Sequence, residues 1–217
     1  MKDKFQLTQK ENIFLAKRNI VDSIWKSANL EGINITFPET NAIYEKLKVK
    51  EVDISEVNTI LNLKHAWKEI LSTIDEELNL EYICKIHNEV AKDEALTWGK
   101  LRTGTVGISG TNYIPKIPEK KEVEEQLEKI KSVSPNTMRC MQLMLYLMKS
   151  QLFWDGNKRT AMLIANKEMI KNGNGIISIP IDNITEFNEL LSRYYTYNET
   201  EKLVDFIYTK AISGINY

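Results

Sequence analysis

The chain has 217 residues, 42% of them hydrophobic, and 29 basic residues balance 30 acidic ones to leave a net charge of −1. This balance argues against a nucleic-acid partner bound by broad phosphate neutralisation. The separated cysteines Cys84 and Cys140 form neither a disulfide scaffold nor a zinc finger, and they suit a cytoplasmic location. The amino terminus lacks the apolar core of a secretion signal, and no apolar run approaches the ~20 residues that span a bilayer. We expect a soluble protein with no membrane partner.

Apolar residues recur at helical spacing along most of the chain, which predicts a mainly helical protein. The expected helices lie within 9–29, 35–49 (after Pro38), 54–74, 80–91 (capped by Asn79), 119–131, 136–150, 157–173, 184–197 and 199–212. A short extended piece, GIISIP, separates two of them. No repeat or linker interrupts the pattern, so we expect a single domain over 1–217.

One segment has a different texture. Residues 99–118, GKLRTGTVGISGTNYIPKIP, combine glycines with β-branched residues and end in prolines, which predicts a short β-hairpin or flap. We therefore divide the domain into an N-terminal region (1–45), this flap (99–118) and a pair of core helices (137–173).

The stretch SQLFWDGNKRTA places an unusual set of polar residues between the two core helices. Lys158 and Arg159 lie in the first turn of the second helix, where free N–H groups and the helix dipole already favour anions, so a polyphosphate would suit them. Asp155 fits beside phosphates if it holds Mg²⁺, and Gly156 allows close approach of the backbone.

A plainer interpretation fits the same residues. Asp155 would cap the helix, Gly156 would form a turn, and the two cations would be a solvated face. Five residues do not separate the two interpretations, because short motifs recur by chance. No Walker loop is present, and the glycines of GTVGISG are not spaced as in a dinucleotide fingerprint.

The stretch resembles the signature of the Fic/Doc (Fido) family, His-Pro-Phe-x-Asp/Glu-Gly-Asn-Gly/Lys-Arg. The matching residues are Phe153, Asp155, Gly156, Asn157, Lys158 and Arg159. SANLEG, with Ser27, Glu31 and Gly32, resembles the inhibitory helix of one class of the family. The flap segment and LEYICKIHNEV also resemble family elements, so the likeness covers about residues 20–172.

The resemblance implies an all-α Fido fold with a small β-hairpin flap, and AMP transfer from Mg·ATP to a hydroxyl side chain of a target protein. It assigns the metal to Asp155 and inhibition to Ser27 and Glu31. The nucleotide-binding residues would be Gly156, Asn157, Lys158 and Arg159. Strand addition on the flap would dock the target protein. The flap residues involved would be Thr103, Thr105, Val106, Gly107, Ile108 and Tyr113.

The sequence departs from the signature at the catalytic position. Gln151 stands where the family has its histidine, and Leu152 where it has proline. A carboxamide has no useful basicity near neutral pH, and loss of a general base typically costs about 10²–10⁴-fold in rate. We interpret His65 and His87 as structural. Transfer is therefore expected to be impaired or absent.

Two further departures concern the phosphate site. Lys158 replaces the glycine of most AMP-transferring members, and lysine occurs there in Doc, which transfers a phosphate. Met162 stands where a second arginine often pairs with the inhibitory glutamate, so we expect Glu31 to reach Lys158 or Arg159 instead. Ser27 and Glu31 also fit an ordinary pair at a helix end capped by Gly32.

Several hypotheses therefore stay open. The chain is a degenerate enzyme that binds Mg·ATP and acts as a regulator, or a Doc-like phosphotransferase. Alternatively, it is a transferase with another base, or an interaction protein without nucleotide. A homo-oligomer is compatible with each of them.

Overall fold

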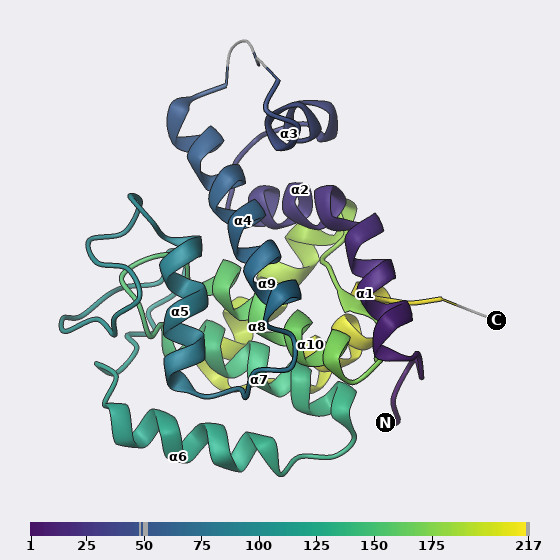
Figure 1. Ribbon diagram of the computed structural model, residues 1–217. Helices are drawn as coiled ribbons and strands as arrows, with labels where there is room; N and C mark the ends of the chain where they lie inside the picture. The colour runs from purple at the N-terminus through teal and green to yellow at the C-terminus, as the bar shows by residue number, and fades with distance from the viewer. Residues whose placement is uncertain (48, 50–51, 216–217) are drawn as a thin grey trace.

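The computed structural model describes residues 1–47, 49 and 52–215 (Figure 1). Residue 48 of the expected 35–49 segment and the last two residues of the expected 1–217 domain lie outside this description. The mainly helical fold is confirmed. The helices are α1 (Gln9–Arg18), α2 (Ile20–Leu30), α3 (Phe37–Tyr44), α4 (Ile54–Ser72), α5 (Leu80–Val90), α6 (Lys120–Lys131), α7 (Asn136–Ser150), α8 (Asn157–Lys171), α9 (Ile184–Tyr197) and α10 (Glu201–Phe206).

A small antiparallel sheet closes the C-terminal part of the chain. Strand β1 (Ile176–Ile177), within the predicted extended piece, pairs with β2 (Ile212–Ser213). A short 3₁₀ turn (Ile181–Asn183) precedes α9, and a π-helical turn (Ile207–Ala211) follows α10. Among the residues described, no helix has the length and apolarity needed to cross a bilayer.

Helices α7 and α8 form the centre of the molecule, with α4 and α5 packed on α8 (Figure 1). Both central helices are apolar on most sides, and twelve of the fifteen residues of α8 are buried. A helix that is apolar on most sides is packed against neighbours on most sides, and these contacts fix its position. The loop between α7 and α8 is thereby held on a rigid base.

The expected single helix over 9–29 is wrong, because the chain breaks at Asn19. The Asn19 side chain donates to the carbonyl of Leu15 at 2.8 Å, and its backbone N–H bonds the carbonyls of Leu15 and Ala16. Asparagine side chains compete for backbone groups in this way, which ends α1 and lets α2 begin in a new direction.

The hairpin expected in 99–118 does not form. The segment contains no strand, and its internal backbone bonding is a turn from Ile108 to Thr111. Carbonyls near both ends of the segment bind the side chain of Arg102 instead of facing each other in a ladder. The flap is thus an irregular loop held at its base.

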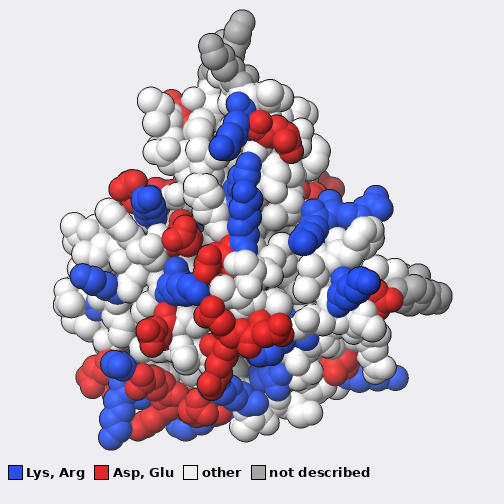
Figure 2. Space-filling model, viewed as in Figure 1, with Lys and Arg blue, Asp and Glu red and all other residues white. Residues whose placement is uncertain are grey.

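Surface charge is mixed. Figure 2 shows acidic and basic side chains interspersed over the face in view, densest over α6, without a broad field of one sign.

Candidate active site

The α7–α8 loop is closed by the side chain of Asn157. Its Oδ1 accepts from the N–H of Phe153 at 2.9 Å, and its Nδ2 donates to the Phe153 carbonyl at 2.8 Å. The same Nδ2 lies 3.2 Å from Oε1 of Gln151. Asn157 is 6% exposed, so its amide holds the loop from within. This placement differs from the phosphate contact that the signature implies for its side chain.

Gln151 ends α7 in the left-handed region, with φ 44° and ψ 61°. Its Nε2 donates to the carbonyl of Met148 at 2.7 Å, while Oε1 receives the bond from Asn157. Both ends of the carboxamide therefore have partners, one in α7 and one at the start of α8, and the side chain has no basic atom to accept a proton.

Gly156 is required where the loop meets α5. Its φ is 71°, and a Cβ there would lie 3.2 Å from Cγ1 of Val90 and 3.4 Å from Cβ of Ala91. A side chain would combine backbone strain with a tight contact. The glycine lets the turn approach α5 closely.

His87 ties this turn to α5 and to the start of the flap. Its Nδ1 accepts from the N–H of Gly99 at 3.0 Å, so Nε2 carries the proton and donates to the carbonyl of Asp155 at 2.9 Å. The ring stacks on Phe153 with 3.7 Å between centroids. Burial is the main cause that lowers the pKa of His87 to about 4; the bond to Asp155 opposes it and Arg159 adds to it.

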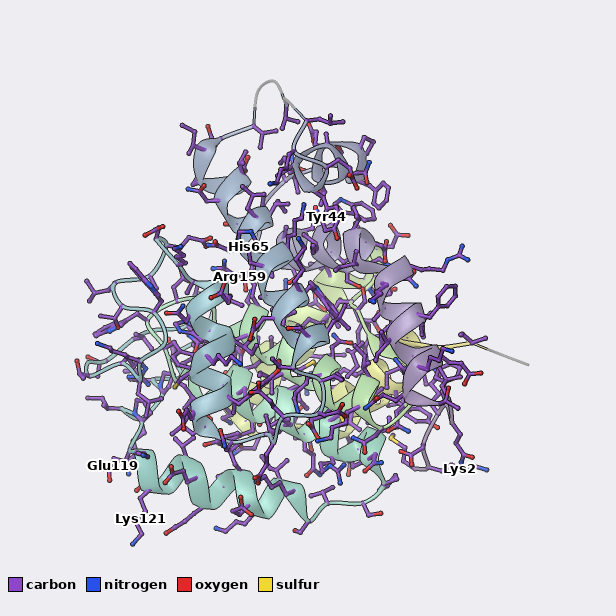
Figure 3. All side chains as sticks on the ribbon, viewed as in Figure 1. Lys2, Tyr44, His65, Glu119, Lys121 and Arg159 are labelled. Carbon is purple, nitrogen blue, oxygen red and sulfur yellow. The ribbon has the colours of Figure 1, made fainter. Side chains whose placement is uncertain are left out.

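The structural interpretation of His87 is confirmed by these contacts, since both ring nitrogens are engaged and the side chain is fully buried. His65 lies on the exposed side of α4 (Figure 3). Neither histidine lines the cavity described below.

Arg159 lies inside the bundle (Figure 3), with its side chain 5% exposed. Its Nη1 donates to Oε2 of Glu94 at 2.6 Å. Two further carboxylates are more distant: Glu31 is 3.8 Å from Nε, and Asp155 is 3.6 Å from Nη2. Burial would lower the pKa of Arg159, but the charges of Glu31, Glu94 and Asp155 outweigh it and raise the pKa.

One edge of the Arg159 guanidinium has no hydrogen-bond partner among the residues that the structure describes. Nε is buried and makes no hydrogen bond, and the carboxylate of Asp155 lies 3.6 Å from Nη2, beyond hydrogen-bond distance. The Nε–Nη2 edge is the fork with which arginine binds two oxygens of a phosphate or carboxylate. No described side chain caps the adjacent N-terminus of α8 either. An anion with two oxygens fits this edge.

Lys158 joins α8 to the end of α2. Its Nζ lies 3.2 Å from Oε2 of Glu31 and donates to the carbonyl of Leu30 at 3.1 Å. The expectation that Glu31 reaches Lys158 or Arg159 is thus met. Ser27 lies a turn earlier and faces a narrow crevice beside Met162 and Trp67, away from Glu31's cavity.

A cavity of about 930 Å³ lies next to Lys158 and Glu31, and its lining includes neither Arg159 nor Asp155. Glu31, Gln151 and Lys158 line it on one side, and flap residues including Gly107 and Ile108 line another. The remaining wall is formed by residues of α9, which are Thr185, Asn188, Glu189, Leu191, Ser192, Arg193 and Tyr195. Sequence reasoning missed this wall and also Glu94, because neither follows a pattern near the motif.

The predicted flap residues differ in placement. Thr103 and Thr105 are exposed, while Val106 is half-buried. Tyr113 stacks on Tyr195 of α9, with ring centroids 6.4 Å apart. Trp154 packs under the flap, since a Cβ on Gly104 would lie 2.6 Å from its Cη2, which supports packing as its role.

The side chain of Asp155 is 60% exposed, and its Oδ1 accepts from the N–H of Gly156 at 2.5 Å. No cluster of three metal-ligating side chains occurs in the part of the chain that the structure describes. A single accessible carboxylate fits Mg²⁺ that takes its remaining ligands from water and phosphates, and does not fit an all-protein metal cage.

Comparisons with known proteins agree with this fold. The family model described as "Fic/DOC family" matches residues 77–169. The "Protein adenylyltransferase Fic" of Nematostella vectensis is 28% identical over 183 residues, which cover 78% of this chain and 42% of that protein. The chain thus spans less than half of this curated relative.

Solved structures show the same fold at low identity. Fic-1 (aa134–508) from C. elegans superposes with a TM-score of 0.76 at 19% identity, over 90% of this chain and 62% of that one. A Fic domain containing signaling protein from Bacteroides thetaiotaomicron gives 0.74 at 15% identity, over 94% and 86%. Residues 77–169 thus resemble the Fic/DOC family, and the chain shares the fold of these Fic structures.

Proposed function

We propose that this cavity binds the phosphates of Mg·ATP and supports transfer of AMP to a hydroxyl side chain of a target protein, at a rate limited by the missing base at Gln151. The observation that carries the proposal is the Nε–Nη2 edge of Arg159, which has no hydrogen-bond partner among the described residues and lies beside the exposed carboxylate of Asp155. A family relative named as a protein adenylyltransferase supports the choice of reaction.

Each residue has a distinct part in this proposal. Arg159 grips two phosphate oxygens with its fork, and the free N–H groups at the start of α8 add donors. Asp155 holds Mg²⁺, which supplies charge neutralisation when it is bound. Asn157 and Gly156 act indirectly: they fix the loop so that the carboxylate of Asp155 lies 3.6 Å from Nη2 of Arg159.

Position 151 sets the rate. Its side chain lines the cavity, so a docked hydroxyl could approach it, but a carboxamide cannot take the proton from that hydroxyl. The nucleotide would then bind while the attacking oxygen stays protonated. A histidine at this position would supply the base, typically worth about 10²–10⁴-fold in rate.

Glu31 acts as a competitor for the cations. Its carboxylate contacts Lys158 and approaches Arg159, the groups that the phosphates need. The phosphates must displace this carboxylate in order to bind the two cations, so Glu31 at the end of α2 lowers the affinity for nucleotide. This is inhibition through Lys158 and Arg159, without the arginine that Met162 replaces.

The experiment compares the wild type with Glu31→Gln, Gln151→His and the double variant. Calorimetry measures Mg·ATP affinity, and ATP labelled at the α- or γ-phosphate measures transfer to the protein itself or to lysate proteins. We expect Glu31→Gln to tighten binding about tenfold, because the half-buried Glu31–Lys158 ion pair no longer competes with the phosphates. The double variant should transfer the α-label at least 100-fold faster than the wild type. His65→Ala, on the exposed side of α4, is the matched control and should change neither quantity.

The outcomes separate the alternatives. Transfer of the γ-label in place of the α-label would replace AMP transfer by a Doc-like phosphotransfer. Tight binding by the double variant without any transfer would show that the base is not the missing element and leave a regulatory binder. Absence of Mg·ATP binding in all four proteins would overturn the proposal.

A further inference from the structure

Arg102 lies at the base of the flap and is 1% exposed. Its Nε donates to the carbonyl of Gln151 at 2.6 Å, and its backbone N–H donates to the carbonyl of Leu152 at 2.9 Å. The residue is therefore fastened to the α7–α8 loop through two consecutive carbonyls. These bonds also fix the backbone of the left-handed residue at position 151.

The other end of the guanidinium gathers the two arms of the flap. Nη1 donates to the carbonyl of Gly104, at the entry of the flap. Nη2 donates to the carbonyls of Lys116 at 2.6 Å and Pro115 at 3.3 Å, at its exit. One side chain thus joins both arms of the flap to each other and to the loop.

The partners of Arg102 are carbonyl oxygens, with no carboxylate among the described residues. Burying a cation without a counter-charge contributes little to stability and commonly costs it. The fork geometry of arginine, with five donors, is what connects carbonyls from three places in the chain. Arg102 therefore serves here mainly to hold these carbonyls in a fixed arrangement, and contributes less to the stability of the fold.

The flap needs such a fastening because it has no strand ladder of its own. Its tip lines the large cavity through Gly107 and Ile108, and position 151 lines the same cavity. A single side chain, that of Arg102, connects the flap to position 151, because it binds carbonyls of both flap arms and of Gln151. Movement of the flap base would therefore change the backbone at position 151.

We propose that Arg102 is a positioning residue that holds the flap at a fixed place over the cavity and sets the backbone of Gln151, so that a segment docked on the flap presents its hydroxyl toward position 151. The docking part of this inference rests on the proposed function. The clamp itself does not, and the two are tested by separate measurements.

The first test is amide hydrogen exchange on the full chain, with Arg102→Lys compared with the wild type. Lysine keeps the charge but cannot reach the loop and both arms together. We expect amides in 103–117 to exchange at least tenfold faster, while those in α7 keep their wild-type rates. Lys167→Met is the control, because Lys167 is also a fully buried cation with a carbonyl partner but lies on α8 away from the flap. It should leave the flap rates unchanged relative to the rest of the chain.

A second variant protects the test if Arg102→Lys does not fold. Gly104→Ala would press a Cβ against Trp154 and displace the carbonyl that Nη1 binds. It should also raise exchange in 103–117 selectively. Unchanged flap exchange in a folded variant, or an equal rise throughout the chain, would overturn the clamp.

The second test concerns docking. In the Glu31→Gln and Gln151→His background, Arg102→Lys should lower the rate of transfer at saturating ATP at least tenfold and leave the KM for ATP within twofold. Arg102 touches no phosphate-binding group, so a merely destabilised site would instead shift both quantities. Equal losses in both would overturn the positioning role. If the background itself binds no Mg·ATP, the proposed function fails while the exchange result on the clamp still stands.

Discussion

Helix α8 buries a cation towards each of its ends, and the two cations differ in how completely they are hydrogen-bonded. At the C-terminal end, the side chain of Lys167 is fully buried, and its Nζ donates to the carbonyl of Glu76 at 2.6 Å and to Oε1 of Glu168 at 3.0 Å. The same atom lies 4.9 Å from the ring of Tyr82. At the N-terminal end, Arg159 is almost as buried, yet one edge of its guanidinium has no hydrogen bond within the described part of the chain.

The electrostatics differ in the same sense. Burial lowers the pKa of Lys167, against the opposing charge of Glu168. Burial acts on Arg159 as well, but three carboxylates around it raise its pKa overall. Lys167 is thus a completed structural contact, whereas Arg159 sits in excess negative charge with donors to spare. Burial alone does not distinguish a binding residue from a structural one; an unused donor edge does.

The largest effect should come from removing the completed contact. Lys167→Met leaves the carboxylate of Glu168 and the carbonyl of Glu76 without their cation, and we expect it to lower the free energy of unfolding by about 3–5 kcal/mol. Urea denaturation measures this. Mg·ATP affinity, measured by calorimetry below the melting temperature, should stay within twofold of the wild type. A large loss of affinity in the folded variant would remove the distinction between the two ends.

Arg159→Lys tests the other end. It keeps the charge but replaces the two-donor edge by a point charge, so we expect Mg·ATP affinity to fall about 100-fold, or about 3 kcal/mol. Calorimetry in the Glu31→Gln background measures it. Affinity equal to that of the background would show that the free edge does not bind the phosphates.

The support behind the loop should respond to pH. The folded pKa of His87 is about 4 against an ordinary value of 6.5. Below pH 6.5 His87 becomes protonated in the unfolded chain but stays neutral in the folded chain until the pH nears 4. The contribution of His87 to stability is therefore fully present above pH 6.5 and falls as the pH falls. We expect this group to remove about 2.5 kcal/mol between pH 7.5 and 4.5. Urea denaturation across this range should show a shallower dependence in His87→Gln, whereas His65→Gln should keep the wild-type slope. Parallel slopes in all three proteins would contradict the role of His87.

The smallest effect isolates the close approach of the loop to α5. Gly156 and Gly32 both have positive φ, at 71° and 86°, but a Cβ on Gly32 would meet nothing within 4 Å. Alanine at Gly32 should cost about 1 kcal/mol from backbone strain alone, and alanine at Gly156 about 1–2 kcal/mol more from the added contact. Equal costs, measured by thermal or urea denaturation, would show that the loop has room to move away from α5.

Much of this molecule follows from local patterns. The helices around α7 and α8 were predicted from apolar spacing, and Asn79 caps α5 as expected, with its Oδ1 accepting from Tyr82 at 2.8 Å. The polar loop stands out from the order of residues, and its link to Glu31 is what the resemblance to the Fic/Doc family implied. Local signals failed at Asn19, where a side chain competes for the helix backbone, and in the flap, where glycines and β-branched residues suggested a ladder that does not form.

The sequence by itself determined the mainly helical fold, the position of the loop and the absence of a basic side chain at Gln151, because each depends on residues close together in the chain. Only the tertiary structure decided which polar groups are hydrogen-bonded within the protein and which remain available to a ligand. It turned Asn157 inward, brought Glu94 to Arg159 from the turn that follows α5, made α9 a wall of the cavity and tied both arms of the flap to Arg102. Hydrogen-bond partners far apart in sequence leave no periodic trace, so three-dimensional packing alone reveals which donors remain for a ligand.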